Sequence, residues 1–395
     1  MSNLFLQEAK ALAPYLQEIF FQLHRNPEMG RQEHKTQALI LAELEKLGIE
    51  AKPIADTGVV GLIRGGKPGK TVGFRADMDA LPIQEEADIP YKSQVPGVMH
   101  ACGHDAHVTV LLGAAKILAA RKDALCGNVK LLFQPNEEGD GGAERMVQAG
   151  CMENPHVDAV FCGHITHRAT TGTIFLGSGP RSAASNPFTV IFRGKGTHGA
   201  QPHCGTDTIV AACQVVTALQ TISSRRTNPT DSVLVSVGAI SGGVVGTGGS
   251  IIPETVRIDG ILRTQTPEIR ARAKEDFRQI VTGVAAAMGV TAQIDMREGY
   301  AATINDDAAT EAVRTAACKV LGQENIIASP KGSMGAEDFG YFSQEAPGCY
   351  YTFGVHKPGT ENWPIHNSKF VADLDALPYG AALYAQIAED FLEKE

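Results

Sequence analysis

PFTVIFRGKG, residues 187–196, marks a change in the pattern of predicted secondary structure. Apolar residues alternate in this stretch as in a half-buried strand, and the helical stretch TDTIVAACQVVTALQTISSR follows it. The next patterns are two strands, a helix and a last strand: SVLVSVGAIS, ETVRIDGILRTQ, PEIRARAKEDFRQIVTGVAAAMG and TAQIDMRE. The order strand-helix-strand-strand-helix-strand predicts a ferredoxin-like α+β domain over residues 186–298.

The sequence on either side of this domain has a different pattern. Before it, apolar strand candidates alternate with helical stretches, which is typical of a sheet flanked by helices; the strands are TVGFRAD (71–77), VKLLFQ (129–134), VDAVFC (157–162) and GTIFLG (172–177). After residue 299 the chain returns to helices and short strands, and it ends in an amphipathic helical stretch. We therefore predict an α/β domain formed by residues 1–185 and 299–395, with residues 186–298 inserted in it.

Composition limits the classes of partner. The 395 residues carry a formal net charge of -9 and a pI near 5.8, which argues against a large basic surface for nucleic acid or an anionic membrane. The N-terminus lacks the features of a signal peptide, no apolar run reaches the ~18 residues of a membrane span, and the eight cysteines have no framework spacing. We expect a cytoplasmic protein with reduced thiols and a small-molecule partner.

Residues that can bind metals follow the predicted strands. Asp77 and Asp79 lie at the end of the first strand, Glu137 and Glu138 follow the second, and His164 follows the third. Ligand sites in open α/β sheets gather at the carboxyl ends of strands. We expect these side chains to meet the segment MHACGHD (99–105), which precedes a helix.

The donor types in this set favour a transition metal. Thiolate and imidazole groups such as Cys102 and His104 bind such ions, whereas magnesium and calcium prefer oxygen donors. Each residue alone is most often an ordinary core or surface residue, but their joint occurrence favours a metal site. The adjacent Glu137 and Glu138 suggest divided roles, one carboxylate binding metal and the other accepting a proton from water. This is machinery for hydrolysis.

A set of motifs spread over nearly the whole chain carries a resemblance to a known family. The motifs are FQLHRNPEMGRQEHKT (21–36), RADMDALP (75–82), MHACGHDAH (99–107), FQPNEEGDGGA (133–143), GKGTHGAQPH (194–203), GAEDF (335–339) and IHNSKF (365–370). Together they resemble the dinuclear metal amidohydrolases that include bacterial hippurate hydrolases, aminoacylases and plant auxin-conjugate hydrolases. The resemblance implies a metallopeptidase domain with a central mixed sheet flanked by helices, and an inserted ferredoxin-like lid or dimerisation domain.

The resemblance also implies roles for individual residues. It implies two divalent metal ions per chain, with zinc or manganese favoured and cobalt or nickel as alternatives; the implied ligands are Cys102, His104, Glu138, His164 and His366, with Cys102 bridging the ions. Glu137 would be the general base. His198 would stabilise the oxyanion, and in relatives this histidine can come from the partner subunit of a dimer, so we expect a homodimer or larger homo-oligomer assembled through the inserted domain.

Two further residues have a functional and a structural interpretation. Asp77 matches a carboxylate that orients a ligand in wider relatives, although an aspartate at a strand end can also cap a turn. Arg263 resembles an arginine of the inserted domain suited to a substrate carboxylate, although it could equally be an exposed strand residue. His100 and His107 match no ligand position.

The predicted reaction is hydrolysis of the amide bond of N-acyl or N-aroyl amino acids. Three positions depart from the family pattern and leave the substrate open: His167, Ser250 after a glycine-rich approach, and Ile261. The alternatives of the same chemistry are a metallocarboxypeptidase or dipeptidase for short peptides, an aminobenzoyl-glutamate hydrolase and an N-acetyl-diaminopimelate deacetylase. The alternative of another class is a catalytically silent protein that binds metal or an amino acid.

Overall fold

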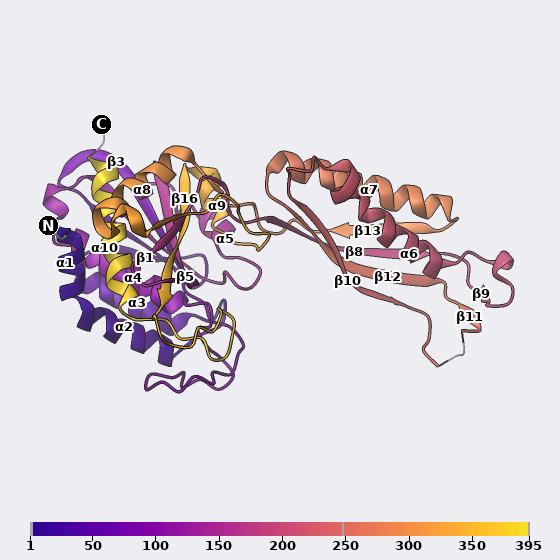
Figure 1. Cartoon of the computed structure of the whole chain (residues 1–395), viewed down its shortest axis with the longest axis horizontal. Helices are drawn as coiled ribbons and strands as arrows, with labels where there is room; N and C mark the ends of the chain where they lie inside the picture. The colour runs from indigo at the N-terminus through magenta and orange to yellow at the C-terminus, as the bar shows by residue number, and fades with distance from the viewer. Residues whose placement is uncertain (1–2, 247–248, 394–395) are drawn as a thin grey trace. The chain divides into compact units, whose positions relative to one another are not determined.

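The computed structural model describes residues 3–246 and 249–393, so two residues of the glycine-rich approach to Ser250 lie outside the described part. The chain divides into two compact units (Figure 1). Unit 1 consists of Met1–Gly179, Ile304–Lys331 and Asp338–Glu395, and unit 2 of Pro180–Thr303 and Gly332–Glu337. The expected insert, 186–298, lies within unit 2. The contribution of 332–337 to that unit had no counterpart in the sequence pattern.

Unit 1 is built on an eight-stranded mixed sheet. In spatial order its strands are β1 (Glu50–Ile54), β2 (Gly58–Arg64), β4 (Cys126–Gln134), β3 (Lys67–Asp77), β5 (Ala159–Thr170), β16 (Gly348–His356), β6 (Ile174–Leu176) and β15 (Ile326–Ala328). The four central strands β4, β3, β5 and β16 are parallel to one another, so their carboxyl ends lie at one edge of the sheet. This is the edge at which ligand sites were expected.

Helices cover both faces of this sheet. The larger core lies under α1 (Leu4–Ala11), α2 (Ala13–Arg25), α3 (His34–Lys46), α4 (His104–Ala119), α8 (Asp307–Leu321) and α10 (Ala376–Leu392), and a smaller core lies under α5 (Ala143–Gln148) and α9 (Gly340–Glu345). Successive side chains of β4 point to opposite faces of the sheet and pack into both cores: Leu131 and Phe133 belong to the larger core and Leu132 to the smaller. The predicted α/β class, with a mixed sheet flanked by helices, is confirmed.

Helix α4 is buried on all sides, and glycines allow its neighbours to approach it. A Cβ atom at Gly113 would lie 2.6 Å from Leu16 Cδ2 of α2, and one at Gly380 of α10 would lie 2.8 Å from Val110 Cγ2. Close packing of this kind holds α4 firmly between α2 and α10. The first residue of α4 is His104, so this packing also fixes a predicted metal ligand.

Unit 2 is an antiparallel four-stranded sheet covered by two helices (Figure 1). The elements follow the chain as β8 (Ala184–Arg193), α6 (Thr208–Leu219), β10 (Val233–Gly242), β12 (Thr255–Thr264), α7 (Pro267–Ala287) and β13 (Thr291–Met296). The spatial order β10-β12-β8-β13, with every neighbouring pair antiparallel, is the order of a ferredoxin-like sheet.

The remaining elements are short. Two two-residue ladders join β9 (Thr197–His198) to β11 (Ile251–Ile252) and β7 (Gly179–Pro180) to β14 (Ile304–Asn305). Single helical turns lie at Lys122–Ala124, Pro202–Cys204, Ile222–Arg226 and Gln323–Asn325. No helix among the described residues has both the length and the apolar character needed to cross a membrane.

One sequence expectation is wrong. We expected the third strand to end at Cys162 and His164 to follow it, but β5 continues to Thr170 and contains His164. The reason is the neighbouring strand β16, which pairs with β5 from Val160 to Thr166 and again at Thr170. A partner strand supplied from nearly 200 residues further along the chain extends β5 beyond what its own sequence indicates.

Candidate metal centre

The five predicted ligand side chains come together at the carboxyl edge of the unit 1 sheet. Donor atoms of Cys102, His104 and Glu138 all lie within 4.8 Å of one another. Cys102 Sγ lies 3.6 Å from His164 Nε2, and His366 Nε2 lies 3.0 Å from Glu138 Oε1. The five residues come from four segments of the chain, because Cys102 and His104 share one, and the fold of unit 1 brings these segments into one cluster.

Two of the histidine rings, those of His104 and His164, are oriented by hydrogen bonds on the nitrogen that faces away from the cluster. His104 Nδ1 donates to Asp79 Oδ1 at 3.2 Å, and His164 Nδ1 donates to the Ile165 carbonyl oxygen at 2.7 Å. His104 Nε2 is buried and has no hydrogen-bond partner. A buried nitrogen without a partner is costly, and a bound metal ion would satisfy it. The donor set therefore fits the predicted metal.

Asp79 connects three parts of the cluster. Besides the bond from His104, its two carboxylate oxygens accept the backbone N–H groups of Glu137 and Glu138, each at 3.0 Å. One buried carboxylate thus fixes the ring of a predicted ligand and the backbone of both glutamates. The sequence placed Asp79 beside the site without giving it a role.

His366 is the most exposed of the predicted ligands, with 49% of its side chain accessible. Its backbone has φ +65°, which is uncommon for a residue other than glycine, and its N–H donates to the Ala101 carbonyl oxygen at 2.8 Å. Backbone strain of this kind concentrates at functional sites. The bond to Ala101 holds His366 next to the Cys102 segment.

His107 lies within the cluster but both of its ring nitrogens are engaged. Nδ1 donates to Asp77 Oδ1 at 2.5 Å, and Nε2 accepts the Ile165 N–H at 2.8 Å. Burial lowers the pKa of His107 to about 3, so the ring is neutral. His107 lies close to Asp77, His104 and His164. It has no lone pair left for a metal, and its two hydrogen bonds connect β3 to β5.

Asp77 does not cap a turn; it is part of a buried charged network. Its Oδ2 accepts from Arg75 Nη1 at 2.6 Å and lies 3.6 Å from His104 Nε2. Arg75 Nη2 in turn donates to Asp338 Oδ1 at 3.0 Å, and Asp338 Oδ2 accepts the backbone N–H groups of Gly142 and Ala143. The motifs RADMD and GAEDF are therefore joined behind the loop that carries the two glutamates.

The electrostatics of the cluster favour a cation. Burial would lower the pKa of His104, but Asp77, Asp79 and Glu138 raise it to about 10. Burial would raise the pKa of Glu138, but His366 and His104 lower it to about 2. Burial and the surrounding carboxylates raise the pKa of the Cys102 thiol well above its usual value. A metal that binds Cys102 must therefore displace its proton.

The two predicted substrate-contacting residues lie in unit 2. His198 is exposed, and its Nδ1 accepts the Ala200 N–H at 3.0 Å, which leaves Nε2 to carry the proton and act as a donor. Arg263 lies on β12 with Nη1 buried and without a hydrogen-bond partner. Burial lowers the pKa of Arg263. Both groups have a donor available for a ligand.

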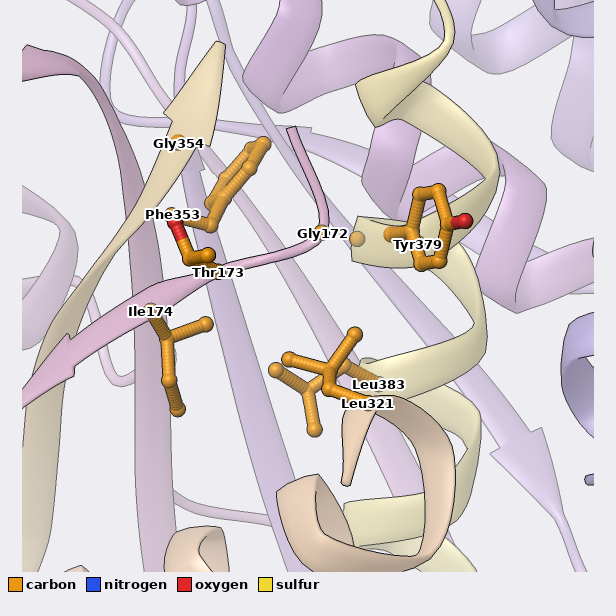
Figure 2. A pocket seen from close by; sticks show the side chains of 9 residues that line it. Gly172, Thr173, Ile174, Leu321, Phe353, Gly354, Tyr379 and Leu383 are labelled. Atoms are coloured by element: carbon orange, nitrogen blue, oxygen red, sulfur yellow. The ribbon is translucent and has the colours of Figure 1, made fainter. Parts of the chain in front are cut away.

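A separate pocket of unit 1 contains none of these residues. Figure 2 shows side chains of Ile174, Leu321, Phe353, Tyr379 and Leu383 around it, and the lining is almost entirely apolar. The space inside it for a water-sized molecule is about 10 Å³, which is room for about one water. It is a packing defect between β6, β16 and α10 and too small for a substrate.

Comparison with known proteins identifies the family of this arrangement. Residues 73–390 match the model of peptidase family M20/M25/M40. The chain belongs to this family. The metallopeptidase fold and the hydrolytic class that the motifs implied are therefore confirmed, and the matched range includes the cluster of predicted ligands and unit 2.

Curated relatives of this chain include enzymes that are named for different substrates. The chain is 39% identical to thermostable carboxypeptidase 2 of Saccharolobus solfataricus over 98% of both chains. It is 40% identical to N-acetyl-L-cysteine deacetylase of Bacillus subtilis over 90% of this chain and 83% of that protein. It is 36% identical to hippurate hydrolase of Campylobacter jejuni over 95% and 96% of the two chains.

Solved structures show the same fold. A putative aminohydrolase from methicillin-resistant Staphylococcus aureus is 32% identical, with a TM-score of 0.93 over 98% of this chain and 99% of that chain. The Bacillus subtilis YXEP protein, a dinuclear metal binding peptidase of the M20 family, is 31% identical, with a TM-score of 0.85 over 98% and 100%. An M20 relative of similar length thus binds two metals.

Proposed function

We propose that this chain is a two-metal hydrolase that cleaves the amide bond of N-acyl or N-aroyl amino acids. The observation that carries the proposal is the cluster of Cys102, His104, Glu138, His164 and His366, next in sequence to Glu137. These five side chains would hold two divalent cations. Zinc or manganese suits the mixed thiolate, imidazole and carboxylate donors, and cobalt or nickel would also bind.

Once bound, the two cations would polarise the amide carbonyl and lower the pKa of a water molecule. Glu137 would accept a proton from the attacking water and deliver it to the leaving amine, while Asp79 holds the Glu137 backbone in place through its N–H. His198 donates from Nε2 to the developing oxyanion. Asp77 keeps His104 and His107 in position from the strand side.

The substrate class is supported by the names of relatives and by a feature of this chain. The deacetylase and the hippurate hydrolase act on N-acyl amino acids, as their names state. Such substrates carry a free carboxylate beside the amide. The Arg263 guanidinium, with a buried and unpartnered Nη1, suits that carboxylate.

The test is a substrate panel with metal-loaded protein. Chain loaded with manganese or zinc is incubated with N-acetyl and N-benzoyl amino acids, and released amine is measured by mass spectrometry. We expect turnover of at least one class, loss of turnover in Glu137→Gln with the metal content retained, and loss of metal in Cys102→Ala. Full metal occupancy in Cys102→Ala would contradict the bridging role, and no amine release from any panel member would favour a silent binding protein.

A second candidate is a carboxypeptidase for short peptides, which the relative from Saccharolobus solfataricus favours. A peptide presents the same amide and carboxylate as an N-acyl amino acid, but it adds an ammonium group near the cations. Side-by-side kcat/KM values for a dipeptide and for the same dipeptide with its amine acetylated separate the two functions. A higher value for the free dipeptide would favour the peptidase.

We also propose that unit 2 mediates assembly of a homodimer. Its sheet ends in the edge strand β10, which exposes Leu234 and Ile240. An exposed edge with apolar side chains favours pairing with another strand. Light scattering of the Leu234→Lys, Ile240→Lys double variant should show a monomer, and an unchanged mass would contradict this role of β10.

A further inference from the structure

A buried group of ionisable residues lies behind the metal cluster, where the proposed reaction does not use it. It consists of His24 at the end of α2, Glu85 in the loop after β3, and Asp105 in the first turn of α4. His24 Nδ1 lies 2.6 Å from Asp105 Oδ2, and Nε2 lies 3.1 Å from Glu85 Oε1. The three side chains are buried.

Both ring nitrogens of His24 act as donors, because each faces a carboxylate. Burial would lower the pKa of His24, but the bonds to Asp105 and Glu85 raise it to about 9, so the ring is an imidazolium at neutral pH. The ring is also held by aromatic contacts, stacked on Phe20 at 5.4 Å and edge-on to Tyr91 at 5.3 Å. His24 therefore has one fixed orientation.

Asp105 transmits this orientation to the start of α4. One of its oxygens accepts from His24, and the other accepts the Ala106 N–H at 2.9 Å. The residue before Asp105 is His104. Its Nε2 is the buried nitrogen without a hydrogen-bond partner in the cluster of predicted ligands. A displacement of the first turn of α4 moves His104 directly.

We infer that His24, bound between Glu85 and Asp105, is a positioning residue that sets the metal affinity of His104. The inference rests on the proposed two-metal function. His24 touches none of the five predicted ligands, so it acts only through Asp105 and the first turn of α4. The sequence offered His24 only as part of the motif FQLHRNPE, without a role.

Two amide substitutions separate this role from a general contribution to folding. In His24→Asn the side-chain nitrogen takes the place of Nδ1 and retains the bond to Asp105. In His24→Gln the nitrogen takes the place of Nε2 and retains only the bond to Glu85. Val313→Ala, in the same core but on α8, is the control for lost stability.

The experiment measures metal binding to the full-length chain by competition with a chelator, and the visible spectrum of the cobalt-loaded protein. We expect His24→Gln to bind one of the two ions 10–100-fold more weakly and to change the cobalt spectrum, in the range known for residues that support metal ligands. We expect His24→Asn to bind within about threefold of the parent, and saturating metal to restore kcat in both variants.

Three outcomes would overturn the inference: equal losses in His24→Asn and His24→Gln, losses no greater than in Val313→Ala, or a kcat that saturating metal does not restore. If His24→Gln fails to fold, Asp105→Asn provides the same test, because it keeps the acceptor for Ala106 and replaces the oxygen that faces His24. His104→Ala separates the two proposals. If that variant retains both ions, the proposed metal centre is wrong; if it loses one while His24→Gln loses none, only the role of His24 is wrong.

Discussion

The two units present their predicted functional histidines in opposite ways. His104 of unit 1 is fully buried, has carboxylates near both ring nitrogens and begins a helix packed on all sides. His198 of unit 2 is exposed, and one backbone N–H orients its ring. A metal ligand must be held in place before the ion arrives, whereas a donor to a transient oxyanion needs only the correct tautomer. The difference agrees with the proposed roles, in which side chains of unit 1 hold the metal ions and His198 of unit 2 contacts the substrate.

The largest expected effect concerns the group that moves the proton. Glu137→Gln should lower kcat by about 10²–10⁴, because the amide cannot accept a proton, while both metal ions remain bound. The measurements are initial rates and metal content by elemental analysis. Glu144→Gln, on the exposed side of α5, is the matched control. Substantial residual turnover in Glu137→Gln would show that another residue is the base.

The next effect tests the exposed histidine of unit 2, His198. His198→Ala should lower kcat by about 10²–10³, the usual cost of losing one oxyanion donor. Its metal content and melting temperature should equal those of the parent, because the side chain is exposed. His203→Ala in the same loop is the control. A loss of metal in His198→Ala would contradict the division of roles between the units.

The substitution Asp79→Asn tests whether the predicted ligands of unit 1 must be held in place for metal binding. The amide cannot accept from His104, Glu137 and Glu138 at once, so metal affinity should fall about 10–100-fold and the melting temperature should also fall. Chelator competition and thermal unfolding measure the two changes. Asp306→Asn, which alters an aspartate that caps α8, is the control and should leave metal affinity unchanged. If the two variants bind metal with equal affinity, Asp79 has no role in metal binding.

A smaller effect is expected at the proposed carboxylate-binding arginine. Arg263→Lys should raise KM about tenfold with little change in kcat, because a lysine gives one hydrogen bond where a guanidinium gives two. Arg257→Lys on the same strand, where the guanidinium pairs with Asp259, is the control. If KM is unchanged for Arg263→Lys, the interpretation of Arg263 as an ordinary strand residue is correct.

The last effect is on stability. The pKa of His24 is raised in the folded chain from 6.5 to about 9, so its contribution to the free energy of unfolding is complete below pH 6.5 and is lost as the pH rises through about 9. The stability difference between metal-free parent and metal-free His24→Gln should therefore shrink over this range, as measured by urea unfolding at several pH values. A constant difference would mean that His24 is neutral when folded.

The sequence by itself determined the candidate donors, the family and the order of the elements, because these depend on local periodicity and on motifs a few residues long. It identified Cys102, His104, Glu138, His164 and His366, and their proximity in unit 1 agrees with that set. Only the tertiary structure decided that β5 runs past His164, that Asp79 braces both glutamates and that His24 lies behind His104. Each of these contacts joins residues far apart in the chain. They depend on strand order, register and helix packing, which no local pattern encodes.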